Sequence, residues 1–180
     1  MQSILDVVGG TYVSDNLVGT KWSKLLINAA FSGLSAALNG TYADVLDSDI
    51  SARAAAHIVD ETIKVAHAQG VRFAPMMGFD LSRLELQSSE DVEVRVQTFR
   101  TLLKAHRLLR ASMLQDLERH RPTEIDYING VIPKQAEGTG ILTPFNSLVV
   151  QCVKQAEEHQ TMPDFETNLK LFARCLKENE

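Results

Sequence analysis

The first long apolar stretch of the sequence carries three polar side chains at a spacing that could support chemistry. Lys24, Asn28 and Ser32 follow one another at intervals of four residues, within a segment that is otherwise mostly apolar. Four residues rotate an α-helix by only about 40° beyond a full turn, so these side chains would form one narrow stripe. A lysine and an asparagine on a buried helix are costly unless they have partners or face a wet cleft. The stripe therefore has two interpretations. It lines a pocket, or it is simply the face of the helix that is exposed to solvent, and the pattern alone does not decide between them.

A second polar group occurs later in the chain. Ser112 lies in a long helical pattern that ends at Pro122, and Glu124 and Asp126 follow in the first turn of the next expected helix. Thr123 and Asp126 have the spacing of a capping box. Carboxylates in a first helical turn commonly complement the helix dipole. From the pattern alone, we interpret this second group as capping.

Helical periodicity from Asp15 onward would position both groups. We expect helices over residues 15–38, 48–69, 89–120, 123–133, 144–159 and 164–178. Asp15 or Thr20 would cap the first helix and Asn39-Gly40 would end it, while Pro133 would kink or end the fourth. The valine-rich residues 4–13 predict two short strands. The pattern as a whole predicts an all-α multi-helix bundle over residues 15–180, preceded by a short extended segment at residues 1–14.

Composition excludes several classes of protein. The chain has 180 residues, of which 44% are hydrophobic, and a net charge of −5, values typical of a soluble globular domain. It has no basic stripe for nucleic acid, no apolar stretch of membrane-spanning length and no recognisable signal peptide. Cys152 and Cys175 form no C-x-x-C motif, and the histidines show no metal-ligand spacing. We therefore expect a cytoplasmic protein with reduced thiols, no metal, and neither nucleic-acid nor membrane partners.

Three stretches of the sequence resemble one enzyme family. TKWSKLLINAAFSGLSAAL, ASMLQDLERHRPTEIDYINGVI and GILTPFNSLV are similar, in residues and in spacing, to the C-terminal domain of 2-dehydropantoate 2-reductases, also called ketopantoate reductases. The resemblance covers roughly residues 15–158. It implies an all-helical fold related to the C-terminal domains of the 6-phosphogluconate dehydrogenase group. It also implies NADPH-dependent reduction of a 2-keto acid to a 2-hydroxy acid, in the pantothenate pathway when the substrate is ketopantoate.

The resemblance assigns roles to both polar groups. It implies that Lys24 is the catalytic lysine and that Glu124 partners this lysine and the substrate hydroxyl. It implies that Asn28 contacts the substrate and that Ser112 binds the substrate carboxylate. A lysine suits this chemistry, because its ammonium group can stabilise the alkoxide that hydride addition creates and can donate the proton.

Two positions depart from the family pattern. Ser32 stands at a substrate-binding position where the family has an asparagine, and Leu109 stands where another substrate-side asparagine can occur. These departures favour, as one alternative, a paralogous reductase of a different 2-keto acid. The alternative from another class is a non-catalytic helical module for dimerisation or partner binding, which keeps the pocket residues by descent.

The sequence contains no dinucleotide-binding fingerprint. Neither Gly9-Gly10 nor residues 138–140 have the G-x-G-x-x-G spacing between a strand and a helix. We therefore expect a nucleotide-binding domain outside this chain to bind NADPH, with residues 1–14 as a linker or remnant of it, and the 180 residues alone to be inactive. The sequence leaves open whether the chain is an isolated domain, a shortened gene product or half of a split protein. An uncovered apolar face would also favour a homodimer.

Overall fold

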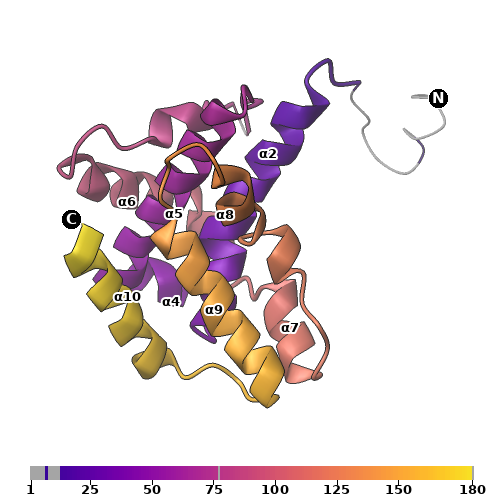
Figure 1. Cartoon of the computed structure of the whole chain (residues 1–180), viewed down its shortest axis with the longest axis vertical. Helices are drawn as coiled ribbons and strands as arrows, with labels where there is room; N and C mark the ends of the chain where they lie inside the picture. Colours follow the sequence, from indigo (N-terminus) through magenta and orange to yellow (C-terminus); the bar gives the residue numbers. More distant parts are fainter. Residues whose placement is uncertain (1–6, 8–12, 77, 180) are drawn as a thin grey trace.

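The computed structural model describes residue 7 and residues 13–76 and 78–179 (Figure 1). Over these residues the chain is a bundle of helices with a single isolated antiparallel bridge between Met76 and Phe79. The expected all-α class is therefore confirmed. The two strands expected within residues 4–13 fall almost entirely outside the described residues.

The helices of the described residues run in the following order. They are α2 (Leu17–Ile27), the π-helix η1 (Asn28–Gly33), α3 (Leu34–Ala37), α4 (Tyr42–Asp47), α5 (Asp49–Ala68), η2 (Leu81–Leu84), α6 (Asp91–Leu102), η3 (Lys104–His106), α7 (Ser112–Glu118), η4 (Ile125–Tyr127), α8 (Val131–Ala136), α9 (Pro144–His159) and α10 (Phe165–Asn179). The elements η2, η3 and η4 are short 3₁₀ helices.

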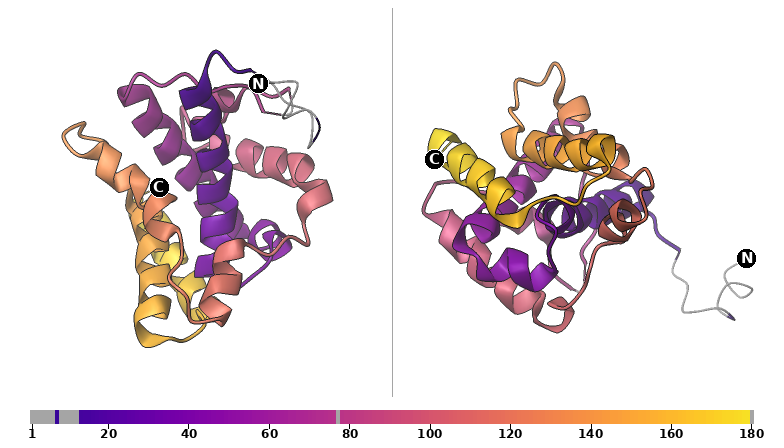
Figure 2. Two further views of the ribbon diagram at one scale, coloured as in Figure 1. Left: turned by 90° about the vertical axis from the view of Figure 1, so that its right-hand side faces the viewer. Right: turned by 90° about the horizontal axis from the view of Figure 1, so that it is seen from below.

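The first helical rod joins α2, η1 and α3 without a break. In the left view of Figure 2 it runs nearly vertically, with the yellow-orange α9 on one side and the pink α6 on the other. Asn16 caps it by accepting a hydrogen bond from the N–H of Gly19, so the expected caps Asp15 and Thr20 were wrong by one and four residues. The expected end is confirmed, because Asn39 adopts a left-handed backbone with φ of 53°.

The core of the bundle surrounds α5. This helix packs against α2, α4, α6, α9 and α10, and most of its apolar side chains are buried. Its expected ends are confirmed: Ser48 accepts a hydrogen bond from Ser51, and Gly70 adopts the positive φ of 70° that follows many helices. The capping residues in the sequence therefore predicted both ends of the longest helix correctly.

The single helix expected over residues 89–120 is wrong. The structure divides this segment into α6, η3 and α7, separated by an irregular stretch at residues 107–111. The carbonyls of Arg107 and Leu109 accept hydrogen bonds from the N–H groups of Ala43 and Tyr42, at the start of α4. Because those carbonyls satisfy the free donors of another helix, they are not part of a continuous helix of their own.

The helix expected over residues 123–133 is also wrong. The Thr123 hydroxyl accepts a hydrogen bond from the N–H of Ile125 and only the short η4 follows, while the carboxylate of Asp126 pairs with Lys154 instead of closing a capping box. Pro133 lies in the first turn of α8, where its missing N–H costs nothing. The proline therefore falls at the beginning of a helix and not at its end.

Candidate functional site

The polar stripe predicted on the first rod crosses the junction between α2 and η1. Lys24 lies in the last turn of α2 and is exposed, whereas Asn28 begins η1 and is half-buried. Ser32 is half-buried, and its hydroxyl oxygen lies 2.7 Å from the hydroxyl oxygen of Tyr42. In a π-helix, hydrogen bonds join residue i to residue i+5 instead of i+4. The angle around the rod between Asn28 and Ser32 therefore differs from the value of about 40° expected for an α-helix. Single-turn π segments of this kind occur frequently at functional sites.

The second polar group lies on and just beyond α7. Ser112 is the first residue of α7, which packs against η1 and α3 and so lies next to the rod that carries the stripe. Glu124 lies in the segment between α7 and η4 and is exposed. In the described part of the chain, the side chains of Lys24, Asn28, Ser112 and Glu124 form neither hydrogen bonds nor ion pairs. The structure thus places the elements of Ser112 and the stripe side by side without joining Lys24 to Glu124.

A buried asparagine, Asn129, contacts the backbone of the π-helix. The sequence patterns did not predict a role for it. The Nδ2 group of Asn129 donates to the backbone carbonyl of Ala29 inside η1, at 3.1 Å, and to Oδ1 of Asn146, at 3.0 Å. Its own Oδ1 lies against Gly33, where the Cβ of any other residue would come within 2.0 Å. A side chain that enters the backbone ladder of a helix is a known cause of such irregularities. We therefore attribute the position of η1 to Asn129, which binds the carbonyl of Ala29 and fits against Gly33.

The same network continues to a buried carboxylate on α5. Glu61 accepts hydrogen bonds from the backbone N–H groups of Phe145 and Asn146, at 2.8 and 2.9 Å, and from Nδ2 of Asn146, at 2.7 Å. It thereby satisfies free N–H groups at the start of α9. Burial raises the pKa of Glu61 to about 7, although these hydrogen bonds favour its charged form. Through Asn146 and Asn129, the central helix is thus linked to the π-helix that carries Asn28 and Ser32.

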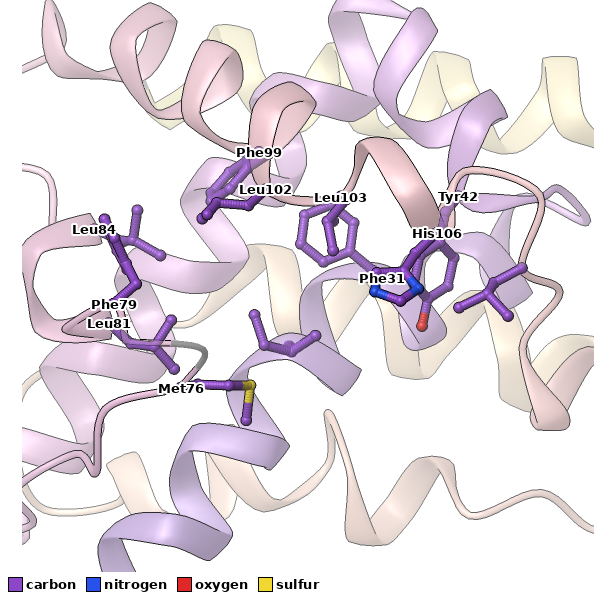
Figure 3. A pocket seen from close by; sticks show the side chains of 12 residues that line it. Phe31, Tyr42, Met76, Phe79, Leu81, Leu84, Phe99, Leu102, Leu103 and His106 are labelled. Carbon is purple, nitrogen blue, oxygen red and sulfur yellow. The ribbon is translucent and has the colours of Figure 1, made fainter.

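An apolar cavity of about 220 Å³ adjoins the rod at Ile27 and Phe31, which directly precede the stripe residues Asn28 and Ser32 in the sequence (Figure 3). Ile27 and Phe31 form its wall on the rod. The remaining lining residues are Tyr42, Met76, Phe79, Leu81, Leu84, Phe99, Leu102, Leu103, His106 and Leu109. The rings of Phe31 and Phe99 meet edge to face at a centroid distance of 5.4 Å. Tyr42 and His106 are the polar-tipped side chains among the described residues of this wall.

Neither a metal-binding cluster nor a membrane-spanning helix occurs among the described residues. No group of three or more histidine, cysteine, aspartate or glutamate side chains there is arranged to hold a metal ion. None of the helices in that part of the chain combines the length and apolar character needed to cross a bilayer. Cys152 and Cys175 are both buried and not joined in a disulfide.

Comparison with known proteins identifies the family. Residues 16–157 match the family described as "Ketopantoate reductase PanE/ApbA C terminal". The chain belongs to the ketopantoate reductase C-terminal family. The matched range includes both polar groups, the Asn129 network and every rod residue that lines the cavity. The resemblance inferred from the three sequence stretches is therefore confirmed.

Individual relatives agree with the family match. The 2-dehydropantoate 2-reductase of Pyrococcus horikoshii is 32% identical over 147 residues, which cover 82% of this chain and 43% of the relative. A ketopantoate reductase structure from Ralstonia eutropha has a TM-score of 0.70 at 26% identity and covers 88% of this chain and 48% of that one. A ternary structure of D-mandelate dehydrogenase with NADH and anilino(oxo)acetate has a TM-score of 0.69 at 27% identity, with coverages of 88% and 60%. The chain thus spans under half the length of the curated relatives it matches.

Proposed function

We propose that this chain is the substrate-binding and catalytic half of an NADPH-dependent reductase that converts a 2-keto acid to a 2-hydroxy acid. The first substrate to test is 2-dehydropantoate, from the pantothenate pathway. The observation that carries the proposal is Lys24, an exposed ammonium group without a partner in the described chain. It lies where α2 meets a π-helix, in a chain that belongs to a reductase family.

Each site residue has a chemical role in this proposal. Hydride addition to a ketone leaves negative charge on the carbonyl oxygen, and Lys24 stabilises that charge and donates a proton to it. Glu124 orients the lysine and accepts a hydrogen bond from the hydroxyl that forms. Asn28, Ser32 and Ser112 donate hydrogen bonds to the carboxylate and carbonyl of the substrate.

The described residues do not themselves fit a dinucleotide. Dinucleotides bind at the carboxyl edge of a parallel sheet, beside a glycine-rich turn that opens a helix. The described part of this chain has no sheet, only the bridge between Met76 and Phe79. NADPH, when bound, would supply the hydride, and a domain outside these 180 residues would hold it. The chain would then form one wall of an interdomain cleft, a common location for ligand sites.

The experiment is a turnover assay on two proteins. One consists of the 180 residues alone, and the other joins them to a nucleotide-binding domain, both followed by the loss of NADPH absorbance with 2-keto acids. We expect turnover only from the joined protein. Turnover by the 180 residues alone would refute the division between the two halves. Failure of the joined protein to reduce any 2-keto acid would refute the reductase proposal and favour the non-catalytic module.

A further inference from the structure

We propose that the apolar cavity beside the stripe binds the substrate side chain, so that the preferred substrate is a 2-keto acid with an aromatic or branched apolar side chain. The inference rests on the proposed function and specifies its substrate. It disfavours 2-dehydropantoate, whose side chain ends in a hydroxyl group, as the best substrate. Four observations support it: the position of the cavity, the contact at its end, the side chains of Ser32 and Leu109, and the size of the cavity.

The cavity wall and the polar stripe lie next to each other on the same rod. Residues three and four apart on a helix are surface neighbours. Ile27 lies three residues after Lys24, and Phe31 lies four residues after Ile27. Both Ile27 and Phe31 line the cavity. A substrate whose keto group lies at Lys24 and Asn28 therefore has apolar wall within reach of its side chain.

The polar stripe meets the cavity at Tyr42. The Tyr42 hydroxyl is hydrogen-bonded to the Ser32 hydroxyl at 2.7 Å, while its ring lines the cavity 5.8 Å from the ring of Phe31. Figure 3 shows Tyr42, Phe31 and His106 at one end of the cavity, and Met76 among the side chains toward the other. The Ser32–Tyr42 pair therefore joins the polar stripe to the wall of the cavity.

Ser32 and Leu109 supply little polarity where they meet this cavity. Ser32 is hydrogen-bonded to Tyr42, whose ring lines the cavity, and Leu109 belongs to the wall itself. Ser32 carries one short hydroxyl, and the side chain of Leu109 has no polar atom. Both residues therefore favour an apolar substrate side chain.

The size of the cavity fits a ring or a branched alkyl group. A protein cavity of about 150 Å³ lined by apolar residues can hold benzene, and this cavity has about 220 Å³. A hydroxyl group buried among these side chains would lose its hydrogen bonds to water with few partners to replace them. The wall offers only the tips of Tyr42 and His106 among its described side chains.

The test compares kcat/KM for four 2-keto acids in the protein that carries both domains. The probes are phenylglyoxylate, 4-methyl-2-oxopentanoate, pyruvate and 2-dehydropantoate. We expect the first two to exceed the other two by at least about tenfold, the scale on which an apolar pocket discriminates. If 2-keto acids are reduced but pyruvate or 2-dehydropantoate is preferred, this inference fails while the proposed function stands. If none is reduced, the proposed function fails and this inference with it.

Two neighbouring leucines provide a matched pair of variants. Leu109 lines the cavity and is 49% exposed, while Leu108 is 87% exposed and is absent from the cavity wall. Leu109→Asn should lower the ratio of kcat/KM for phenylglyoxylate to that for pyruvate about tenfold. Leu108→Asn introduces the same side chain and should keep the wild-type ratio. Equal ratios in the two variants would show that the cavity does not select the substrate.

Discussion

Glu61→Gln should abolish a pH dependence of stability that arises at the junction of α5 and α9. In the native protein the Glu61 carboxylate is buried, receives three hydrogen bonds from Phe145 and Asn146, and lies near the like charge of Asp60. Glutamine has nearly the same shape and cannot ionise. Its amide, like a protonated carboxyl group, is neutral and combines a donor group with an acceptor oxygen, although the NH₂ carries two N–H donors.

The magnitude follows from the shift in pKa. Burial raises the pKa of Glu61 from 4.5 to about 7. Between these values the folded protein retains a proton that the unfolded chain has released, so the stabilisation is complete below about pH 4.5 and is lost as pH rises through 7. One pKa unit corresponds to about 1.4 kcal/mol. The wild type should therefore lose about 3 kcal/mol relative to the Gln variant across this window.

The assay is urea unfolding of both proteins at intervals from pH 4 to about pH 8. Subtracting one free energy of unfolding from the other cancels the titration of groups common to both proteins. Cys175 lies close enough to feel the Glu61 charge, but burial keeps the pKa of its thiol at about 11, outside the window. If the difference in free energy of unfolding between the two proteins stays constant, or shifts in favour of the wild type as pH rises, Glu61 is not protonated in the folded protein.

Three further predictions concern Gly33 on the rod, the Tyr42–Ser32 pair and the buried thiol of Cys152. Gly33→Ala should lower the free energy of unfolding by about 2 kcal/mol, because its Cβ would collide with Oδ1 of Asn129; an unchanged urea midpoint would contradict that contact. Tyr42→Phe should raise KM for 2-keto acids several-fold in the two-domain protein, since Ser32 loses the hydrogen bond that orients it; an unchanged KM would remove the pair from the site. Cys152 should resist thiol reagents in the folded protein at pH 8, because burial raises the pKa of its thiol to about 11; labelling as fast as in urea would contradict this.

Local signals in the sequence correctly predicted the helices whose ends depend on their own residues. Ser48 marks the start of α5, Gly70 follows its end, and Pro144 begins α9. These signals are local because caps and prolines act on the backbone within one turn. The resemblance to the ketopantoate reductases was visible for a similar reason. It rests on contiguous stretches that the printed sequence contains in full.

Features that depend on residues distant in sequence could not be predicted in this way. The break between α6 and α7 results from hydrogen bonds of Arg107 and Leu109 to the start of α4, and periodicity carries no information about such bonds. Asn129, to which we attribute the π-helix, lies 100 residues beyond Ala29, the residue whose carbonyl it binds. Asn129 and Asn146 do lie inside the recognised stretches, which is the signal that could have identified them. Glu61, in an ordinary helical pattern, gave no such signal.

The most direct test of the catalytic proposal is kcat for 2-keto acid reduction by Lys24→Ala in the two-domain protein. General acid catalysis contributes about 10²- to 10⁴-fold, so kcat should fall at least about a hundredfold. The free energy of unfolding should change little, because Lys24 is exposed and its side chain has no partner in the described chain. A variant that folds normally and keeps the wild-type kcat would contradict the role of Lys24 in proton transfer.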